Sequence, residues 1–342
     1  MKSYKMTKVL WIKFNPWVIG KTGKPRKIPR PSKEIQQFEK LIKISLETLG
    51  LPYDVFHEHD RSLSNIRFKD YGVKIKFHGT KETHKCFDLF YMQMHLKNIF
   101  QIDPMGWGVS HSSNPSVNKQ KITQISKKDL LNLNQNIERV RNGHTKFPQS
   151  PPKFALQSFN KPRQGFIFAP LQTPNDTVIK NHSPVSVVDS IKLISEMAKN
   201  EEKDVVFKLH PSTYRHRQLN FEIIKLLLTN KNVYLSKQPI LKLIEEACYV
   251  TTINSGVGFE SLLLGKPVVL LGDADYDLLA YKFRGDNTDL HDYLNDFYLP
   301  KNKILRKNFL GHYISNHCYD VSAKQLEKSQ IDRLMNLVKA QL

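Results

Sequence analysis

The stretch TTINSGVGFESLLLGKPV, residues 251–268, decides the fold of the second half of this chain. Its first residues complete an apolar strand, residues 256–264 predict a helix, and the residues that follow begin another strand. Asn254 or Ser255 is a suitable N-cap for the helix, and Gly265 is a suitable end. A strand, a helix and a strand joined by such short connections are typical of a parallel sheet.

The same alternation continues on both sides of this stretch. Strands are predicted at 165–170, 205–209, 233–235, 249–253 and 268–272, and helices at 185–199, 219–228 and 241–247. Strands that alternate with helices of this length imply a parallel sheet covered by helices on both faces.

The first half of the chain begins with another α/β pattern. A strand is predicted at 9–14, a basic loop at 20–33, a helix at 33–49 and a strand at 73–77; residues 86–100 carry aromatic and Met residues at helical spacing, and 128–141 predicts a helix. Four prolines punctuate the unpatterned segment 142–163, where we place the domain boundary. Because 342 residues exceed one ordinary core, we expect an α/β fold with two Rossmann-like lobes, at 1–155 and 156–320, and a C-terminal helix in 321–342.

The formal charge of +20 suggests a partner of opposite sign; the alternative is a lysine-rich surface that is simply solvated. Residues 1–50 contain twelve Lys or Arg against three acidic residues, and residues 301–342 contain eight against three. An anionic membrane surface and nucleic acid both attract such segments. The lysines among the first twenty residues interrupt any signal-peptide core, and no apolar stretch approaches the length of a membrane span, so we expect a cytoplasmic protein.

Three predicted strands end in residues that suit a ligand site, because ligands of open parallel sheets bind beyond the carboxyl ends of the strands. These ends are Gln172 with Asp176, His210-Pro211, and Asn254-Ser255-Gly256. At the third, small residues and unpaired helix amides favour a phosphate, and Glu260 one turn later suits ribose hydroxyls. The alternatives are a glycine that serves helix packing, a surface histidine, an Asx turn at Asp176 and a solvated Gln172.

Other acidic and histidine groups give weaker signals. Asp103, near Gly106 and Gly108, fits a tight loop. Asp273-Ala274-Asp275 matches the D-x-D pattern of one class of metal-dependent glycosyltransferase, but it follows the strand after the glycine turn and we interpret it as a solvated loop. His57 and His59 lack the spacing of a zinc motif. We therefore expect neither a metal ion nor a cofactor.

Taken together, three motifs resemble the bacterial capsule polysaccharide biosynthesis family, which includes β-Kdo transferases. They are Phe168-Ala169-Pro170-Leu171-Gln172 with Asp176, Lys208-Leu209-His210-Pro211, and the stretch 251–268. The resemblance covers roughly 165–272; in the first half it depends on His78-Gly79 and Ile102-Asp103-Pro104. It implies a GT-B-like fold that uses CMP-Kdo, without a metal ion and with retention of configuration.

The resemblance also implies roles for individual residues. His210 contacts the CMP phosphate, Asn254, Ser255 and Gly256 hold the nucleotide, and Glu260 binds its ribose; Gln172, Lys208 and Pro211 complete the donor site. Asp176 takes the place of the carboxylate that attacks the anomeric carbon, and Asp103 is the acid/base candidate of the facing lobe. Lys208, Arg163 and Arg215 are the candidates that meet the carboxylate of Kdo.

We therefore predict a glycosyltransferase that transfers Kdo to a lipid-linked or growing surface glycan at the inner face of the membrane. The basic loop 20–33, with Lys24, Arg26, Lys27 and Arg30, is expected to face the acceptor or anionic lipid. The alternatives are an inverting transferase that uses a UDP or GDP sugar, a nucleotide-sugar epimerase, and a basic nucleic-acid-binding protein. Against the last, no helix-turn-helix, zinc or RNP pattern is present, and no nucleic-acid partner is expected.

Overall fold

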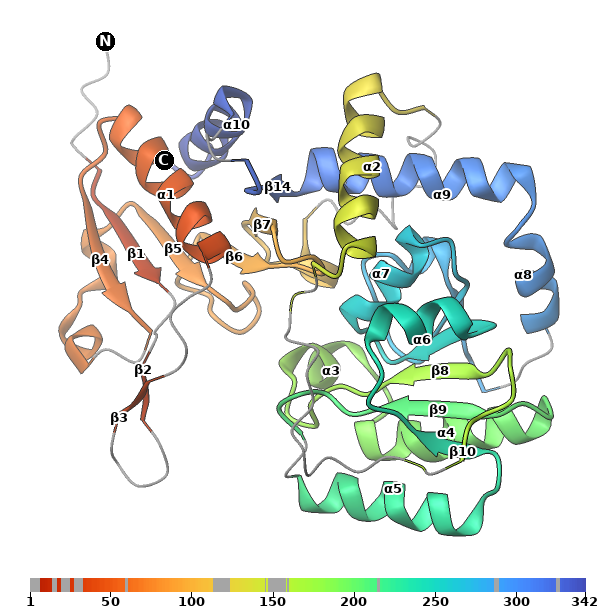
Figure 1. Cartoon of the computed structure of the whole chain (residues 1–342). Helices are drawn as coiled ribbons and strands as arrows, with labels where there is room; N and C mark the ends of the chain where they lie inside the picture. Colours follow the sequence, from red (N-terminus) through yellow and green to blue (C-terminus); the bar gives the residue numbers. More distant parts are fainter. Residues whose placement is uncertain are drawn as a thin grey trace. The chain divides into compact units, whose positions relative to one another are not determined.

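The computed structural model describes most of the chain: residues 7–13, 17–19, 25–27, 33–58, 61–112, 124–144, 146, 158, 160–213, 216–285, 289–323 and 327–342. The chain divides into two compact units, one formed by Met1–Asn114 with Ile314–Leu342 and the other by Pro115–Tyr313. Each unit is described by itself (Figure 1).

The first unit is built on a mixed sheet. Its strands, in sheet order, are β14 (Tyr319–Asp320), β7 (Ile99–Asp103), β6 (Leu89–Gln93), β5 (Val73–Phe77), β1 (Val9–Lys13) and β4 (Tyr53–His57). The pairs from β6 to β4 are parallel, whereas β7 runs antiparallel to both β6 and β14. A parallel core with an antiparallel edge is common in α/β folds.

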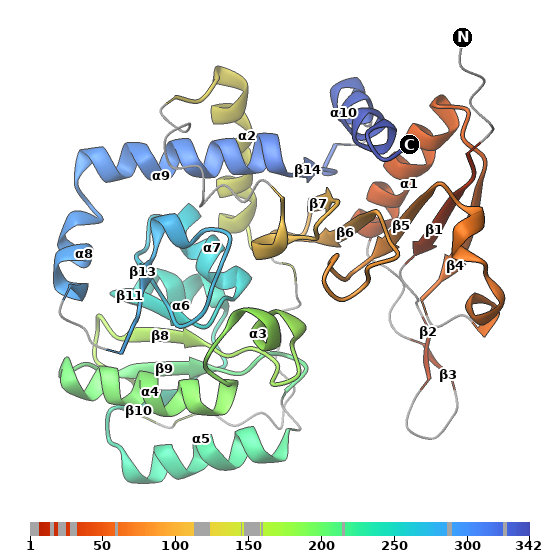
Figure 2. The ribbon, with the colours of Figure 1, turned by 180° about the vertical axis from the view of Figure 1, so that it is seen from behind.

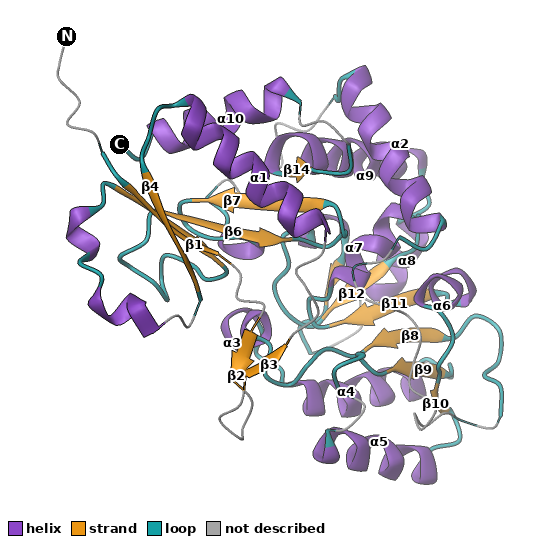
Figure 3. Ribbon diagram, turned by 60° about the vertical axis from the view of Figure 1, so that its left-hand side comes forward, coloured by secondary structure: helices purple, strands orange, loops and turns teal. Residues whose placement is uncertain are grey.

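Two helices that are distant in sequence cover one face of this sheet. They are α1 (Lys33–Thr48) and α10 (Lys328–Lys339), which lie side by side in Figures 1 and 3. Phe38 of α1 stacks on Phe100 of β7 at 4.7 Å between ring centroids, and Leu334 and Val338 of α10 join the same core. Helix α1 ends at Thr48, within one residue of the predicted bound, and the backbone beyond it closes the last turn: the amide of Gly50 donates to the Glu47 carbonyl and that of Leu51 to the Leu46 carbonyl.

The opposite face of this sheet has a smaller cover. The 3-10 turns η1 (Arg61–Asn65) and η2 (Phe68–Asp70) contribute partly buried side chains that pack against Leu10 and Phe90. A separate antiparallel pair, β2 (Trp17–Ile19) and β3 (Pro25–Lys27), lies in the N-terminal segment. A strand therefore interrupts what the sequence predicts to be a continuous basic loop at 20–33.

The helical spacing at 86–100 is a wrong prediction, because these residues form β6 and the start of β7. Leu89, Phe90 and Tyr91 are all fully buried. Central strands that are covered on both faces lose the two-residue alternation, so their apolar residues also fit a helical repeat. The hairpin between β6 and β7 replaces the expected helix.

The second unit contains a fully parallel six-stranded sheet. Its order is β10 (Val233–Leu235), β9 (Val205–Lys208), β8 (Ile167–Pro170), β11 (Tyr249–Thr252), β12 (Val268–Leu270) and β13 (Tyr281–Lys282). Strands β8 to β12 agree with the predicted positions to within about two residues at each end.

Helices cover both faces of this sheet (Figure 3). Those that follow its strands are α3 (Thr177–His182), α4 (Val187–Asn200), α5 (Arg217–Thr229), α6 (Ile240–Glu246) and α7 (Gly256–Leu263). Ile167 and Ala169 of β8 share a core with Ile191 of α4, whereas α6 and α7 contact β8, β11 and β12 from the other side. The expected doubly covered sheet is confirmed.

The boundaries of the compact units differ from the expected lobes 1–155 and 156–320. Helix α2 (Lys127–Arg141) packs against α9 (Pro300–His312), so both belong to the second unit, together with α8 (Leu290–Asp296). Residues 314–342 return to the first unit through β14 and α10. These contacts join segments that are far apart in the sequence, such as β7 with β14 and α1 with α10, which a composition shift near 142–163 does not reveal.

Among the described residues, no helix combines the length and the hydropathy that a membrane span requires.

Candidate functional site

The carboxyl ends of three neighbouring strands gather the predicted donor-site residues within the second unit. Strand β8 lies between β9 and β11. Gln172 and Asp176 follow β8, His210 follows β9, and Asn254 and Ser255 follow β11. All the strands are parallel, so these loops share one edge of the sheet, where ligands of such folds bind.

Gln172 and Asn254 bind each other across this edge. The Gln172 side-chain amide donates to Asn254 Oδ1 at 3.0 Å, and Gln172 Oε1 accepts from the Asn254 backbone amide at 3.1 Å. Both side chains are buried. They fix the loop after β8 to the start of α7, so their contribution to a ligand site is to position the groups around them.

The N-terminus of α7 has one of the predicted caps. Ser255, one of the two predicted caps, is the N-cap, and its Oγ accepts from the Val257 amide at 3.2 Å. Gly256 is the first helical residue. Helix amides that lack intrahelical acceptors, together with the positive end of the helix dipole, favour a phosphate.

Two other glycines of this motif have structural roles, one in packing and one in ending the helix. A Cβ at Gly258 would lie 2.4 Å from the Tyr276 hydroxyl, so this glycine allows the close approach of Tyr276, which is the packing alternative. Gly265 has φ +77°. Its amide donates to Leu262 and that of Lys266 to Ser261, which closes the helix end as predicted.

Asp176 is the N-cap of α3. One carboxylate oxygen accepts from the Val178 amide at 3.0 Å, and the side chain is half-buried. The turn alternative is therefore correct for the local structure. A carboxylate has several lone-pair positions, so capping leaves acceptor capacity for a second role.

His210 has a defined tautomer. The backbone amide of Ser212 donates to His210 Nδ1 at 3.2 Å, and the Ser212 hydroxyl lies 2.7 Å from the same nitrogen. Because Nδ1 accepts, the proton of the neutral ring is on Nε2, which suits a hydrogen bond to phosphate. Burial lowers the pKa of His210, Asp176 opposes this shift and the charge of Lys146 adds to it.

Lys146 is a charged member of this site that sequence reasoning missed. Burial lowers its pKa to about 8, while Asp176 and Glu260 favour its charged form. Burial also raises the pKa of Glu260 to about 8, and Lys146 opposes that shift. Lys146 thus interacts with both acidic groups and with His210. It lies in the unpatterned segment that we interpreted as an interdomain boundary, where no local signal marks it.

The three cations proposed for the sugar carboxylate are placed differently. The Lys208 ammonium is buried and donates to the carbonyls of Gln238 at 2.7 Å and Lys237 at 3.4 Å. Burial lowers its pKa to about 8. The hydrogen bonds of Lys208 anchor the turn after β10.

Arg163 precedes β8 and binds Asp204, which precedes β9, with contacts of 2.9 and 3.1 Å from its guanidinium. It therefore lies at the amino ends of the strands, opposite the site edge. Arg215 lies outside the described residues, and Pro211 is exposed directly after His210.

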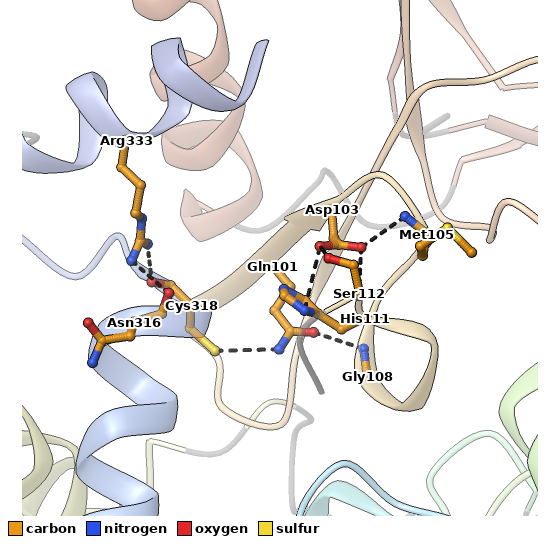
Figure 4. Close-up of polar contacts among 9 residues, drawn as sticks. All are labelled: Gln101, Asp103, Met105, Gly108, His111, Ser112, Asn316, Cys318 and Arg333. Atoms are coloured by element: carbon orange, nitrogen blue, oxygen red, sulfur yellow. Dashed lines mark hydrogen bonds and ion pairs between the residues drawn. The ribbon is translucent and has the colours of Figure 1, made fainter. Parts of the chain in front are cut away.

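Asp103, in the first unit, is a buried anchor for the loop that follows β7 (Figure 4). Its carboxylate accepts from the amides of Met105 at 2.8 Å and Ser112 at 2.9 Å, and from the Ser112 hydroxyl at 2.5 Å. His111 Nδ1 lies 3.5 Å from the same group. The tight-loop interpretation is therefore correct for its local structure.

The two motifs of the first unit that carry the resemblance lie together. Lys81, three residues after His78, donates its amide to the carbonyl of Met105 at 2.8 Å. The rings of His78 and Trp107 are 5.3 Å apart, and His78 has a positive φ of 57°. The loop after β5 thus packs on the loop after β7.

The acidic pair Asp273 and Asp275 is only in part a solvated loop. Asp273 forms an ion pair with Lys282, whereas Asp275 is buried and accepts a hydrogen bond from the Tyr313 hydroxyl. Within the described part of the chain, no group of three or more His, Cys, Asp or Glu side chains is arranged to hold a metal ion.

Known proteins are similar to this chain in sequence over part of its length and in fold. The profile of the family described as "Capsule polysaccharide biosynthesis protein" matches residues 119–320, more than half of the chain. Capsule polysaccharide export protein KpsS of Escherichia coli is 29% identical over 164 residues, which cover 45% of this chain and 41% of that protein. Protein FixF of Sinorhizobium fredii is 34% identical over 164 residues, which cover 43% and 36%. The matches thus span about two-fifths of these relatives.

Two solved structures from Thermosulfurimonas dismutans KpsC are similar in fold to most of the chain. The β-Kdo 2,7 transferase has a TM-score of 0.52 at 16% identity and covers 97% of this chain and 99% of that one. The β-Kdo 2,4 transferase has a TM-score of 0.51 at 13% identity and covers 89% and 96%. The expected α/β fold with two Rossmann-like lobes of the GT-B type is confirmed.

Proposed function

Because the chain belongs to the capsule polysaccharide biosynthesis protein family, we propose that it is a glycosyltransferase that transfers Kdo from CMP-Kdo to a lipid-linked or growing glycan, with retention of configuration. One observation carries this proposal: Asp176, His210, Glu260 and the capped N-terminus of α7 gather at one sheet edge, where Lys146 interacts with all three side chains.

The donor would bind with its phosphate at the N-terminus of α7. The amides beyond Ser255 and the Nε2 proton of His210 would hold the phosphate oxygens, and their interaction would strengthen as CMP departs with its negative charge. Glu260 would accept hydrogen bonds from the ribose hydroxyls. These groups stabilise a phosphate leaving group through hydrogen bonds and a helix dipole.

Asp176 would attack the anomeric carbon. A bond forms between its free carboxylate oxygen and that carbon while the bond to the CMP oxygen breaks. The acceptor hydroxyl then displaces Asp176, loses its proton to a base, and restores the original configuration. Lys146 would meet the carboxylate of Kdo, since Lys208 and Arg163 are engaged elsewhere. The acid/base role of Asp103 stays a prediction.

The acceptor suggests the place of action. A lipid-linked glycan would bring the protein to the inner face of the membrane, where anionic lipid would attract its basic surface. The side chains of Lys24, Arg26, Lys27 and Arg30 lie outside the described residues, so the predicted contact of the segment 20–33 with acceptor or lipid stays a prediction.

Intact-mass measurement after incubation with CMP-Kdo tests the donor and the nucleophile. The wild type should gain one Kdo, and Asp176→Asn should not, although Asn keeps the N-cap of α3. Asp189→Asn is the matched control, because Asp189 likewise lies at the N-terminal end of a helix of the same unit. Release of CMP without an adduct would contradict double displacement. Turnover of a UDP or GDP sugar in place of CMP-Kdo would refute the donor assignment.

A further inference from the structure

Helices α8 and α9 of the second unit meet at a corner of the ribbon (Figure 2). Apolar side chains are exposed at this corner. Tyr298 is 49% exposed, Leu299 40% and Ile304 59%. Phe297 beside them is buried, and Phe309 and Leu310 of α9 also face the core. The core is therefore formed by other residues of the two helices, and these three side chains remain largely exposed to solvent.

The same corner is strongly basic. Lys301, Lys303 and Lys307 are exposed, and no acidic residue occurs between Asp296 and Asp320. Arg306 lies over the Phe297 ring at 4.1 Å and donates to the Phe297 carbonyl at 3.3 Å. These two contacts connect α9 to the end of α8, so they stabilise the turn that precedes the lysines.

Helical spacing places Lys303, Ile304 and Lys307 on one side of α9. Lys303 and Lys307 are four residues apart, and Ile304 and Lys307 are three apart, so all three are neighbours on the surface. Lysine stems can lie along apolar surface while their ammonium groups reach outward. Tyr298 has an apolar ring and a polar hydroxyl, which suits a position between an apolar and an aqueous phase.

We propose that this corner, residues 298–307, docks on the surface of an anionic lipid bilayer. Ile304 and Leu299 would enter the boundary between headgroups and acyl chains, and the lysines would bind lipid phosphates. Nucleic acid offers phosphates but no acyl phase to cover Ile304 and Leu299. The inference rests on the proposed function only in that both expect a lipid-linked acceptor. Binding to vesicles can be measured without donor or acceptor, so it tests the surface by itself.

Helix α5 carries a second exposed apolar surface, which is the alternative site for contact with a bilayer. Helix α5 exposes Phe221 at 66% and Leu228 at 81%, accompanied by Arg217 and Lys225. Its face is more apolar and carries fewer cations than the α8–α9 corner. Binding that requires anionic lipid therefore favours the corner over α5.

Co-sedimentation of the full chain with vesicles tests the surface. Vesicles of phosphatidylglycerol mixed with phosphatidylcholine should bind the protein, and phosphatidylcholine alone should not. Each basic residue near an anionic surface contributes about fivefold to partitioning, so Lys303→Glu with Lys307→Glu should weaken binding at least about 30-fold. The matched control, Lys192→Glu with Lys199→Glu on exposed positions of α4, makes the same change in net charge and should leave binding nearly unchanged.

A second variant separates lipid from other polyanions. Leu299→Ser with Ile304→Ser should weaken vesicle binding and leave the retention of the protein on single-stranded DNA unchanged. Equal losses from both charge-reversal pairs, loss caused by Phe221→Ser with Leu228→Ser instead, or no binding to anionic vesicles would each overturn the proposal. Transfer from CMP-Kdo to an acceptor without lipid, measured in parallel, reports on the proposed function separately. Circular dichroism verifies that each variant is folded.

Discussion

Replacing Glu260 by Gln should change how stability depends on pH. Glu260 is 4% exposed, and burial raises its pKa from the ordinary 4.5 to about 8. The folded state therefore holds a proton that the unfolded chain loses near pH 4.5. Stability from this group is fully present below pH 4.5 and is lost as the pH rises to about 8. Because a tenfold change in proton affinity corresponds to about 1.4 kcal/mol, the total loss is about 5 kcal/mol.

Gln keeps the shape of Glu260 and does not titrate, so the variant should not show this loss. Urea unfolding at pH 5 and pH 8 would measure the free energy of unfolding of both proteins. The gain in this free energy caused by Glu260→Gln should be larger at pH 8 than at pH 5 by several kcal/mol, on the order of the loss calculated for Glu260. Glu196→Gln, at an exposed position of α4, is the control and should give parallel curves. If Glu260→Gln also gives parallel curves, Glu260 is ionised in the fold and the argument is wrong. Above about pH 8, where Glu260 is ionised, the same variant should bind CMP more weakly, since it lacks the anionic partner of the ribose.

Three further predictions concern the same edge of the sheet. Gly258→Ala should destabilise the protein by about 1–3 kcal/mol because its Cβ would lie 2.4 Å from the Tyr276 hydroxyl, and thermal unfolding should show partial recovery when Tyr276→Phe is added. Asp176→Ala should cost about 1 kcal/mol in urea unfolding through loss of the α3 cap, whereas Asp176→Asn should cost much less; equal costs would contradict the capping role. His210→Ala should weaken CMP binding about tenfold by calorimetry, and wild-type affinity should rise as the pH falls below the lowered pKa of His210, because the imidazolium then gains charge; an affinity independent of pH would contradict its contact with phosphate.

The second unit could be predicted from its sequence because its signals are local. Strand β10 was predicted with its observed bounds, Val233–Leu235, and α7 was predicted from its cap and its closing glycine. Each of these features depends on residues within one or two turns of one another. The clustering of Asp176, His210 and Ser255 followed from the rule that parallel strands share an edge.

The remaining features depend on contacts between distant residues. The helical prediction for 86–100 failed because β6 is buried on both faces, a fact that only the assembled sheet supplies. Lys146 joins Asp176 and Glu260 from a segment without periodicity. The hydrogen bonds that occupy Lys208 likewise come from the turn after β10, nearly thirty residues away. A motif identifies these side chains but not the partners that decide what they can do.

The return of residues 314–342 to the first unit also affects how the chain folds while it is being translated. Strand β14 completes the edge of β7, but it emerges from the ribosome about 200 residues after residue 114. At roughly 5–20 residues per second, this interval is on the order of 10–40 s. During that time β7 has an open edge and α1 lacks the neighbouring α10, a state in which strands pair with other chains. The nascent N-terminal sheet should therefore depend on chaperones, while the second unit, which is continuous in sequence, can fold first.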